Sequence, residues 1–150
     1  MKFNLEIRNI QSSKRIILRF LCTYPRSFGH VDAIMDTGAP ITILSANDAL
    51  RLKMPFSNFP STKPIKGFGR GGTPALSLHD FQLTLHSTDN ERKNLKFPIV
   101  LVDIPTLRKF GEDALNNALT IPTLIGLDFL ETNNLKLFID IKNNIAYLED

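Results

Sequence analysis

Apolar residues alternate with polar ones at a period of two along much of this 150-residue chain, and this pattern limits the possible folds more than any other feature. Side chains on a β-strand point alternately to its two faces, so the alternation predicts strands with one buried face. Sustained 3.6-residue periodicity is scarce, and we therefore expect a mainly β chain. The expected strands are 16–24, 30–35, 41–44, 76–85, 95–102, 135–141 and 145–148.

One or two short helices and a further helical turn complete this expectation. Ser45 followed by Asp48 has the spacing of a helix N-cap, which predicts one or two helical turns ending near Leu52. Apolar residues at helical spacing over 105–120 predict a short amphipathic helix, although Gly111 interrupts the pattern. A further turn of helix is expected at 127–130.

The length fits one domain over 1–150 with a core at about 16–148, because a chain of this size can bury roughly 70% of its unfolded surface. No apolar run approaches the ~20 residues of a membrane span, and the first residues lack the apolar stretch of a secretory signal. We therefore expect a cytoplasmic protein without a membrane partner. The single cysteine, Cys22, excludes an intrachain disulfide and is expected in the core.

Metal and nucleic-acid sites are not indicated. The histidines (His30, His79 and His86) do not have the spacing of metal ligands, so we expect no metal and no cofactor. The net charge of +3 is mild, and the basic residues are spread along the chain. A nucleic-acid binder is therefore the lowest-ranked hypothesis.

A carboxylate stands on a glycine-containing turn between two apolar runs. Asp36, Thr37 and Gly38 follow the run 31–35 and precede the run 41–44. A charge there is unfavourable unless the site uses it, although Asp and Gly also favour ordinary turns. Two carboxylates about 3 Å apart share one proton and can serve as both acid and base in peptide hydrolysis. The chain holds no second Asp-Thr-Gly or Asp-Ser-Gly, so it would supply only half of such a pair.

Four features in order make the chain similar to the retropepsin-like aspartic proteases, the family of the retroviral proteases and their cellular and prokaryotic relatives. The resemblance covers about residues 16–148 and implies a closed, mostly antiparallel β-barrel of the acid-protease fold, with one half of an active site. The features are Asp36-Thr37-Gly38-Ala39 after a strand, the apolar strand 41–44, the glycine-rich segment 67–72, and Leu124-Ile125-Gly126 before a short helix.

The resemblance also implies a role for each of these residues. Asp36 would be the catalytic carboxylate, and Thr37, Gly38 and Ala39 would support it within the loop. Thr37 would also join the two half-site loops, and Gly38 would contact the substrate backbone. Leu124, Ile125 and Gly126 would support this loop from below. A flap that closes over the substrate would comprise Gly67, Phe68, Gly69, Arg70, Gly71 and Gly72.

The glycine-rich segment has two other interpretations. It fits the dinucleotide pattern Gly-x-Gly-x-x-Gly, but that fingerprint requires a strand before it and a helix after it. Two prolines over 60–66 and the strand-like residues after Thr73-Pro74 argue against both elements. A single Arg-Gly-Gly is an equally weak signal for RNA.

Neither of two other aspartates has the sequence context of a second catalytic group. Asp128 is expected to have a structural hydrogen-bonding role, and Asp32 to lie in a turn or on the surface. The second carboxylate is therefore expected from Asp36 of another copy, related by a twofold axis. The resemblance implies that terminal strands join the copies, with 135–148 as the first candidate and 5–10 as the second.

The leading hypothesis is a homodimeric aspartic endopeptidase that cleaves peptide or protein substrates. Two departures from the retroviral pattern leave an alternative open. Pro40 stands where retroviral members usually have an acidic residue, and the segment 104–120 is longer than their connection. The alternative is a retropepsin-fold dimerisation or peptide-binding module with little or no proteolytic activity.

Overall fold

The structure is a computed structural model that describes residues 1–66 and 72–150. Strands dominate it, so the expected mainly β class is confirmed. The strands of the larger sheet are β2 (Glu6–Ile10), β3 (Ser13–Tyr24), β4 (Ser27–Met35), β5 (Ile43–Leu44), β6 (Ser61–Ile65), β7 (Thr73–Leu78), β8 (Gln82–His86), β9 (Arg92–Lys96), β10 (Ile99–Val102) and β11 (Leu124–Ile125).

These strands follow the order β6-β7-β10-β5-β11-β4-β3-β8-β9, with β2 paired to β3 beside this path. Most neighbours are antiparallel, but β10 runs parallel to β5 and β11 runs parallel to β4. No pairing among the described residues joins β6 to β9, the two ends of the order. Closure of the sheet into a barrel therefore stays a prediction.

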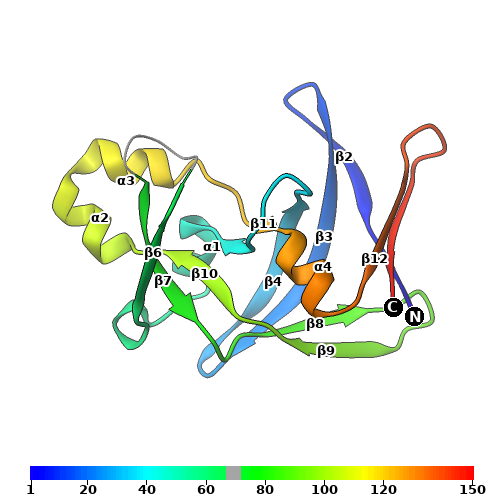
Figure 1. The fold of residues 1–150 in the computed structure, drawn as a ribbon, viewed down its shortest axis with the longest axis horizontal. Helices are drawn as coiled ribbons and strands as arrows, with labels where there is room; N and C mark the ends of the chain where they lie inside the picture. Colours follow the sequence, from blue (N-terminus) through cyan, green and yellow to red (C-terminus); the bar gives the residue numbers. More distant parts are fainter. Residues whose placement is uncertain (67–71) are drawn as a thin grey trace.

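A smaller antiparallel sheet holds both chain ends. Its order is β1 (Lys2–Asn4), β13 (Ile145–Glu149) and β12 (Lys136–Asp140). Asn144 adopts φ 56° in the turn before β13, a conformation that asparagine tolerates well. The carboxylate of Asp150 pairs with the N-terminal ammonium group and with Lys93, so the two ends lie side by side (Figure 1).

The described residues include four α-helices, so the expectation of one or two was too low. The expected helix over 105–120 is two helices because Gly111 has φ 110°, outside the helical region. The N-cap is confirmed, since the Ser45 hydroxyl accepts a hydrogen bond from the Asp48 N–H at 3.0 Å. The helices are α1 (Ala46–Arg51), α2 (Ile104–Phe110), α3 (Glu112–Ala118) and α4 (Leu127–Thr132), with a 3-10 turn η1 (Phe56–Asn58).

Several strands are shorter than expected. The expected strand 76–85 is two strands, because its apolar positions shift by one residue between Leu78 and Phe81. A continuous strand would put these two residues on opposite faces, yet both are buried. Similarly, 95–102 divides between β9 and β10, and 41–44 is a strand only at β5. Asp32 lies on the exposed face of β4, which confirms a surface position and corrects the expected turn.

Two apolar clusters form the core within the described part of the chain. The larger one packs under β3, β4, β8 and α4 and includes Cys22, which is fully buried as expected. Burial raises the pKa of the Cys22 thiol to about 12. The smaller cluster joins Ile43, Ile65 and Leu107 beneath α2 and α3, which Figure 1 places beside β6 and β7, away from the chain ends. Among the described residues, no helix combines the length and apolar character needed to cross a membrane.

Candidate active site

Asp36 directly follows the last residue of strand β4, and β11 pairs with this end of β4. The two strands run parallel and pair Leu124 with Ile34 and Ile125 with Met35. The Ile34 N–H donates to the Thr123 carbonyl at 2.9 Å, and the Asp36 N–H donates to the Ile125 carbonyl at 3.0 Å. The backbone of Asp36 is therefore held by β11, a strand from the other end of the sequence.

The loop after β4 turns around the Asp36 carboxylate. Its Oδ1 atom accepts a hydrogen bond from the Gly38 N–H at 2.9 Å, and the Asp36 carbonyl accepts from the Ala39 N–H at 3.1 Å. This is the arrangement of an Asx-turn, in which aspartate folds the chain back on itself. Asp36 is half-buried, whereas Thr37 and Gly38 are exposed. The carboxylate is therefore oriented by its own loop and remains accessible.

Gly126 allows the loop to lie directly on the segment that supports it. A Cβ atom at Gly126 would lie 2.6 Å from the Ile41 carbonyl oxygen and 2.7 Å from that of Ala39, closer than such atoms can approach. The Leu127 N–H donates to the Ala39 carbonyl at 2.9 Å, and the Asp128 N–H donates to the Pro40 carbonyl at 3.3 Å. The start of α4 thus satisfies the backbone carbonyls of the loop, and only glycine fits between them.

A first Thr–Asp pair, Thr42 with Asp128, joins the loop to α4. The Thr42 hydroxyl donates to Asp128 Oδ1 at 2.8 Å, and the Thr42 N–H donates to Oδ2 at 2.9 Å. The same hydroxyl accepts from the Gly126 N–H at 3.1 Å. Thr42 is buried, so these bonds are shielded from water. The expected structural hydrogen-bonding role of Asp128 is confirmed.

A second Thr–Asp pair, Thr123 with Asp48, repeats this arrangement on the other side. The Thr123 hydroxyl donates to Asp48 Oδ2 at 2.6 Å and accepts from the Ser45 N–H at 2.9 Å. Reasoning from the sequence missed both threonines. The only available signal was that each stands three residues before the N-cap of a short helix, Ser45 or Gly126.

Two cavities meet at Asp36. The first, the apolar cavity, has a volume of about 410 Å³ and contains Asp36, Pro40, Ile41, Leu124, Lys63 and Lys66 in its lining. The second, the hairpin cavity, has a volume of about 320 Å³ and is lined by Asp36, Met35, Pro122, Lys14 and Arg15. Asp36 is the one carboxylate that lines either cavity among the described residues. The arrangement offers a half-buried acid beside an apolar groove with cationic borders.

The glycine-rich segment lies mostly outside the described residues. Gly67, Phe68, Gly69, Arg70 and Gly71 are not described, whereas Gly72 is. Gly72 has φ 82°, and a Cβ atom there would lie 2.9 Å from the Pro64 Cβ and 3.2 Å from the Ile65 carbonyl oxygen. Strands β6 and β7, which flank the segment, are antiparallel and pair Ile65 with Thr73. They place Lys63 to Lys66 along the apolar cavity.

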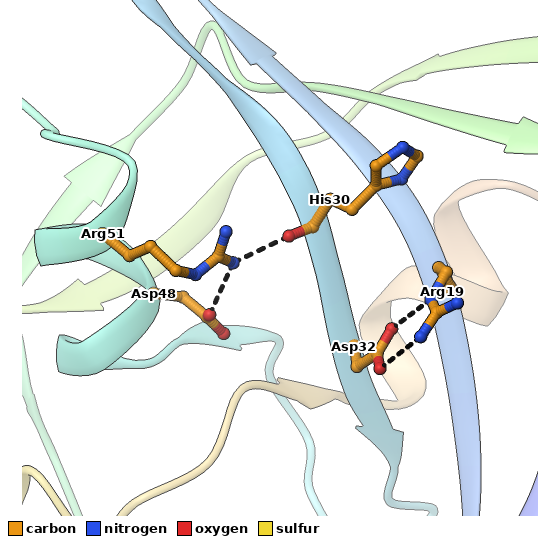
Figure 2. A pocket seen from close by; sticks show the side chains of 5 residues that line it. All are labelled: Arg19, His30, Asp32, Asp48 and Arg51. Atoms are coloured by element: carbon orange, nitrogen blue, oxygen red, sulfur yellow. Dashed lines mark hydrogen bonds and ion pairs between the residues drawn. The ribbon is translucent and has the colours of Figure 1, made fainter.

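A third cavity, of about 510 Å³, lies apart from Asp36 and is lined by charged residues (Figure 2). The Arg51 guanidinium donates to Asp48 at 2.8 Å and to the His30 carbonyl at 2.7 Å. Arg19 donates to both carboxylate oxygens of Asp32, at 2.6 and 2.9 Å. These hydrogen bonds lower the pKa of Asp32. Each cation here has a carboxylate partner, so the cluster balances its own charge.

No group of three or more His, Cys, Asp or Glu side chains in the described part of the chain could hold a metal ion. Pro40 lies at the border of the apolar cavity and has no N–H to donate. Its carbonyl and that of Ala39 are already used by α4. The candidate site therefore consists of one carboxylate, its loop, the supporting strand β11 and the two cavities.

Comparisons with known proteins found likeness in structure alone. No protein-family model matches the sequence, and no curated protein matches it significantly. A retropepsin-like aspartic protease from Rickettsia conorii is 16% identical, with a TM-score of 0.56 over 99% of this chain and 89% of that chain.

Two further solved structures align with lower TM-scores. The EIAV protease in complex with the inhibitor HBY-793 is 19% identical, with a TM-score of 0.46 over 88% of this chain and 100% of that chain. The retroviral protease-like domain of Ddi1 from Leishmania major is 18% identical, with a TM-score of 0.47 over 89% of each chain. With the Rickettsia structure as the basis, this chain has the fold of the retropepsin-like aspartic proteases.

Proposed function

We propose that this chain, as a single domain over residues 1–150, is one half of a homodimeric aspartic endopeptidase. The observation that carries the proposal is the solitary Asp36, which stands half-buried on an Asx-turn between two cavities, within an aspartic-protease fold. A second copy related by a twofold axis would bring its own Asp36 to the first. Thr37 and Gly38, exposed beside Asp36, would then face the same residues of that copy.

The chemistry would follow from the close approach of two carboxylates. Both cannot be ionised at about 3 Å, so they share one proton and titrate as a pair. The ionised member would take a proton from a water molecule, while the protonated member would donate to the carbonyl oxygen of the peptide bond. The water oxygen would attack the carbonyl carbon and give a tetrahedral intermediate with two hydroxyl groups. The C–N bond would then break as the proton taken from the water passes to the leaving nitrogen, and one hydroxyl would return its proton to the other carboxylate. Residues 67–72 are proposed as the flap that excludes other water.

The smaller sheet is the proposed contact between copies. β12 is paired on one side only among the described residues, by β13, and its free edge could accept a strand. Four large apolar side chains of this hairpin are exposed, and Phe138 also stacks on Tyr147 at 4.9 Å between ring centroids. They are Phe138, Ile139, Ile141 and Ile145.

Cleavage of a diverse peptide library between mildly acidic and neutral pH tests the proposal. The wild-type chain is expected to cleave some peptides, and Asp36→Asn to lose about a thousandfold or more of that activity, since amides replace both the acid and the base of the pair. Asp113→Asn, an exposed change on α3 away from both cavities, is the matched control. Activity that persists in Asp36→Asn would exclude the mechanism.

The dimer has its own test. On dilution, specific activity is expected to fall as copies separate, in step with the loss of dimer measured by sedimentation. A monomer with full specific activity would contradict the shared site.

One observation favours a peptide-binding or dimerisation module as the second candidate function. The Ala39 and Pro40 carbonyls are occupied by α4, and Pro40 has no N–H, so the loop offers little beyond Gly38 to hold a substrate backbone. Binding of a statine-type peptide, which mimics the tetrahedral intermediate, separates the two candidates. Tight binding that requires Asp36 supports the protease, whereas binding no tighter than that of an ordinary peptide, without turnover, supports the module.

A further inference from the structure

The two cavities at Asp36 share an unbalanced positive charge. Lys63 and Lys66 border the apolar cavity, and Lys14 and Arg15 border the hairpin cavity. All four are exposed, and none forms an ion pair with any residue that the structure describes. The undescribed residues 67–71 include no Asp or Glu that could pair with them. The charge at these borders is therefore not neutralised within the chain.

The described residues of the third cavity lack this imbalance. There Arg19 faces Asp32 and Arg51 faces Asp48, so each cation has an internal partner (Figure 2). At the apolar cavity, Lys63 and Lys66 face a lining whose one described carboxylate is Asp36, and neither lysine forms an ion pair with it. A cleft with an excess of charge of one sign concentrates ligands of the opposite sign. The geometry thus points to an acidic ligand at Asp36.

We propose that the apolar cavity selects peptides that carry an acidic side chain a few residues from the scissile bond, held by Lys63 and Lys66. The inference rests on the proposed function for the position of the scissile bond. Pro40, Ile41 and Leu124 would bury an apolar side chain in the same groove. The lysine stems can lie along these apolar surfaces while their ammonium groups remain at the border.

The geometry of an extended peptide makes the combination possible. Side chains along a strand alternate in direction and advance by about 3.3 Å per residue, so a residue near the scissile bond and one two positions away share a face. The first would enter the apolar part of the groove, and the second would reach the lysines. In a twofold dimer the groove occurs twice, so an acidic residue on either side of the scissile bond would be favoured.

The test uses one parent peptide and its substituted series. Glu, Gln or Lys replaces each of the four residues on either side of the scissile bond, with kcat and KM measured for every peptide. Peptides with Glu at the selected position are expected to exceed their Gln counterparts by about threefold to tenfold in kcat/KM, mainly through KM. This preference is expected to shrink as the salt concentration rises from 0.05 to about 0.5 M, because the lysines are exposed.

Two variants that each lose two positive charges test whether Lys63 and Lys66 cause the preference for Glu. Lys63→Gln/Lys66→Gln is expected to abolish the preference for Glu over Gln, measured as the ratio of kcat/KM for the two peptides with the same protein. Lys96→Gln/Lys109→Gln removes two exposed lysines that line neither cavity at Asp36, and is expected to keep the preference. Equal rates for Glu and Gln peptides at all positions would overturn the inference, as would a preference that survives in the Lys63→Gln/Lys66→Gln protein.

A binding measurement separates this inference from the proposed function. Fluorescent versions of the same peptides are titrated with Asp36→Asn, which retains both lysines. Lysine-dependent binding of Glu peptides without any cleavage by the wild-type chain would sustain the inference and refute the protease. Cleavage of the neutral parent without a preference for Glu would support the protease and refute the inference. If no peptide is bound or cleaved, both the inference and the proposed function are refuted.

Discussion

Two segments of this chain, 42–51 and 123–132, are built alike although about 80 residues separate them. Each begins with a threonine, continues through a two-residue strand, β5 or β11, and enters a six-residue helix, α1 or α4. The strands pair with each other at Ile43 and Leu124. Each threonine hydroxyl accepts a hydrogen bond from the N-cap N–H of the other segment. The same hydroxyl donates to an aspartate on the helix of that other segment.

The segments differ in what precedes them. The first follows the Asp36 loop, whereas the second follows Ile121 and Pro122, which carry no ionisable group. The support for a carboxylate loop is therefore present twice in one chain, but the carboxylate is present once. Both supporting segments are present in this chain, so the single Asp36 is not explained by the absence of one of them. Because only one segment follows a carboxylate, the proposed chemistry needs the Asp36 of a second chain.

Mixing of subunits tests the comparison with the largest expected effect. When wild-type chains exchange with a tenfold excess of Asp36→Asn chains, most active chains acquire an inactive partner, and the activity per wild-type chain should fall about tenfold. An equal excess of an unrelated protein is the control. If the second segment supplied the missing acid within one chain, activity would not change on mixing.

Alanine at the two N-cap positions, Gly126 and Ser45, should lower the free energy of unfolding by different amounts. Gly126→Ala would place a Cβ atom within 2.7 Å of two carbonyl oxygens and is expected to cost about 3 kcal/mol or more of the free energy of unfolding. Ser45→Ala removes one capping bond and should cost about 1 kcal/mol. Urea denaturation measures both values, and equal losses would show that the loop can move away from α4.

Valine at the two threonines should show how far the segments are equivalent. Thr42→Val and Thr123→Val each leave a buried N–H and a carboxylate oxygen without the hydroxyl, at an expected cost of about 2 kcal/mol. Thr42→Ser and Thr123→Ser keep the hydroxyl and should recover most of this loss. In the folded proteins, only Thr42→Val is expected to lower peptidase activity, because its segment directly continues the Asp36 loop. A larger activity loss in Thr123→Val would reverse this assignment.

The smallest expected effect concerns an ion pair that is present in the first segment and has no counterpart in the second within the part of the chain that the structure describes. Arg51 pairs with Asp48 on α1, whereas Glu131 stands at the corresponding position after Asp128 on α4. Arg51→Gln should cost about 0.5 kcal/mol at low salt and less at about 1 M salt, because the pair is partly exposed. Glu131→Gln, which removes no ion pair among the described residues, is the matched control and should have a smaller effect. A loss that does not depend on salt would assign the effect to the Arg51 hydrogen bond with His30.

The sequence predicts those parts of the molecule that depend on local pattern. Alternation places β3, β4, β12 and β13, the Ser45 N-cap is correct, and the Asp36 turn lies where the motif indicates. These features depend on side chains a few residues apart. The break between β7 and β8 was also visible in the shifted apolar positions at Leu78 and Phe81, although the expectation ran them together.

The remaining features depend on contacts between distant segments, which a single sequence does not reveal. β11 is only two residues long and is stabilised by pairing with β4 and β5, about 80 to 90 positions earlier. Thr42 and Thr123 look like ordinary strand residues, since threonine favours strands for packing reasons. The position of Lys63 and Lys66 near Asp36 is also not visible in the sequence, because it arises only where β6 borders the same cavity as Asp36.

Cys22 has a practical consequence for all of these measurements. It is the one cysteine in the chain and lies near the end of β3, between Gly29 of β4 and Leu83 of β8. Its thiol is fully buried, which raises its pKa to about 12. Alkylating reagents attack thiolates, so modification requires that β3 first separate from its neighbours. The rate of Cys22 alkylation, followed by mass spectrometry, therefore reports how often the sheet that carries Asp36 opens, and no cysteine has to be introduced for the measurement.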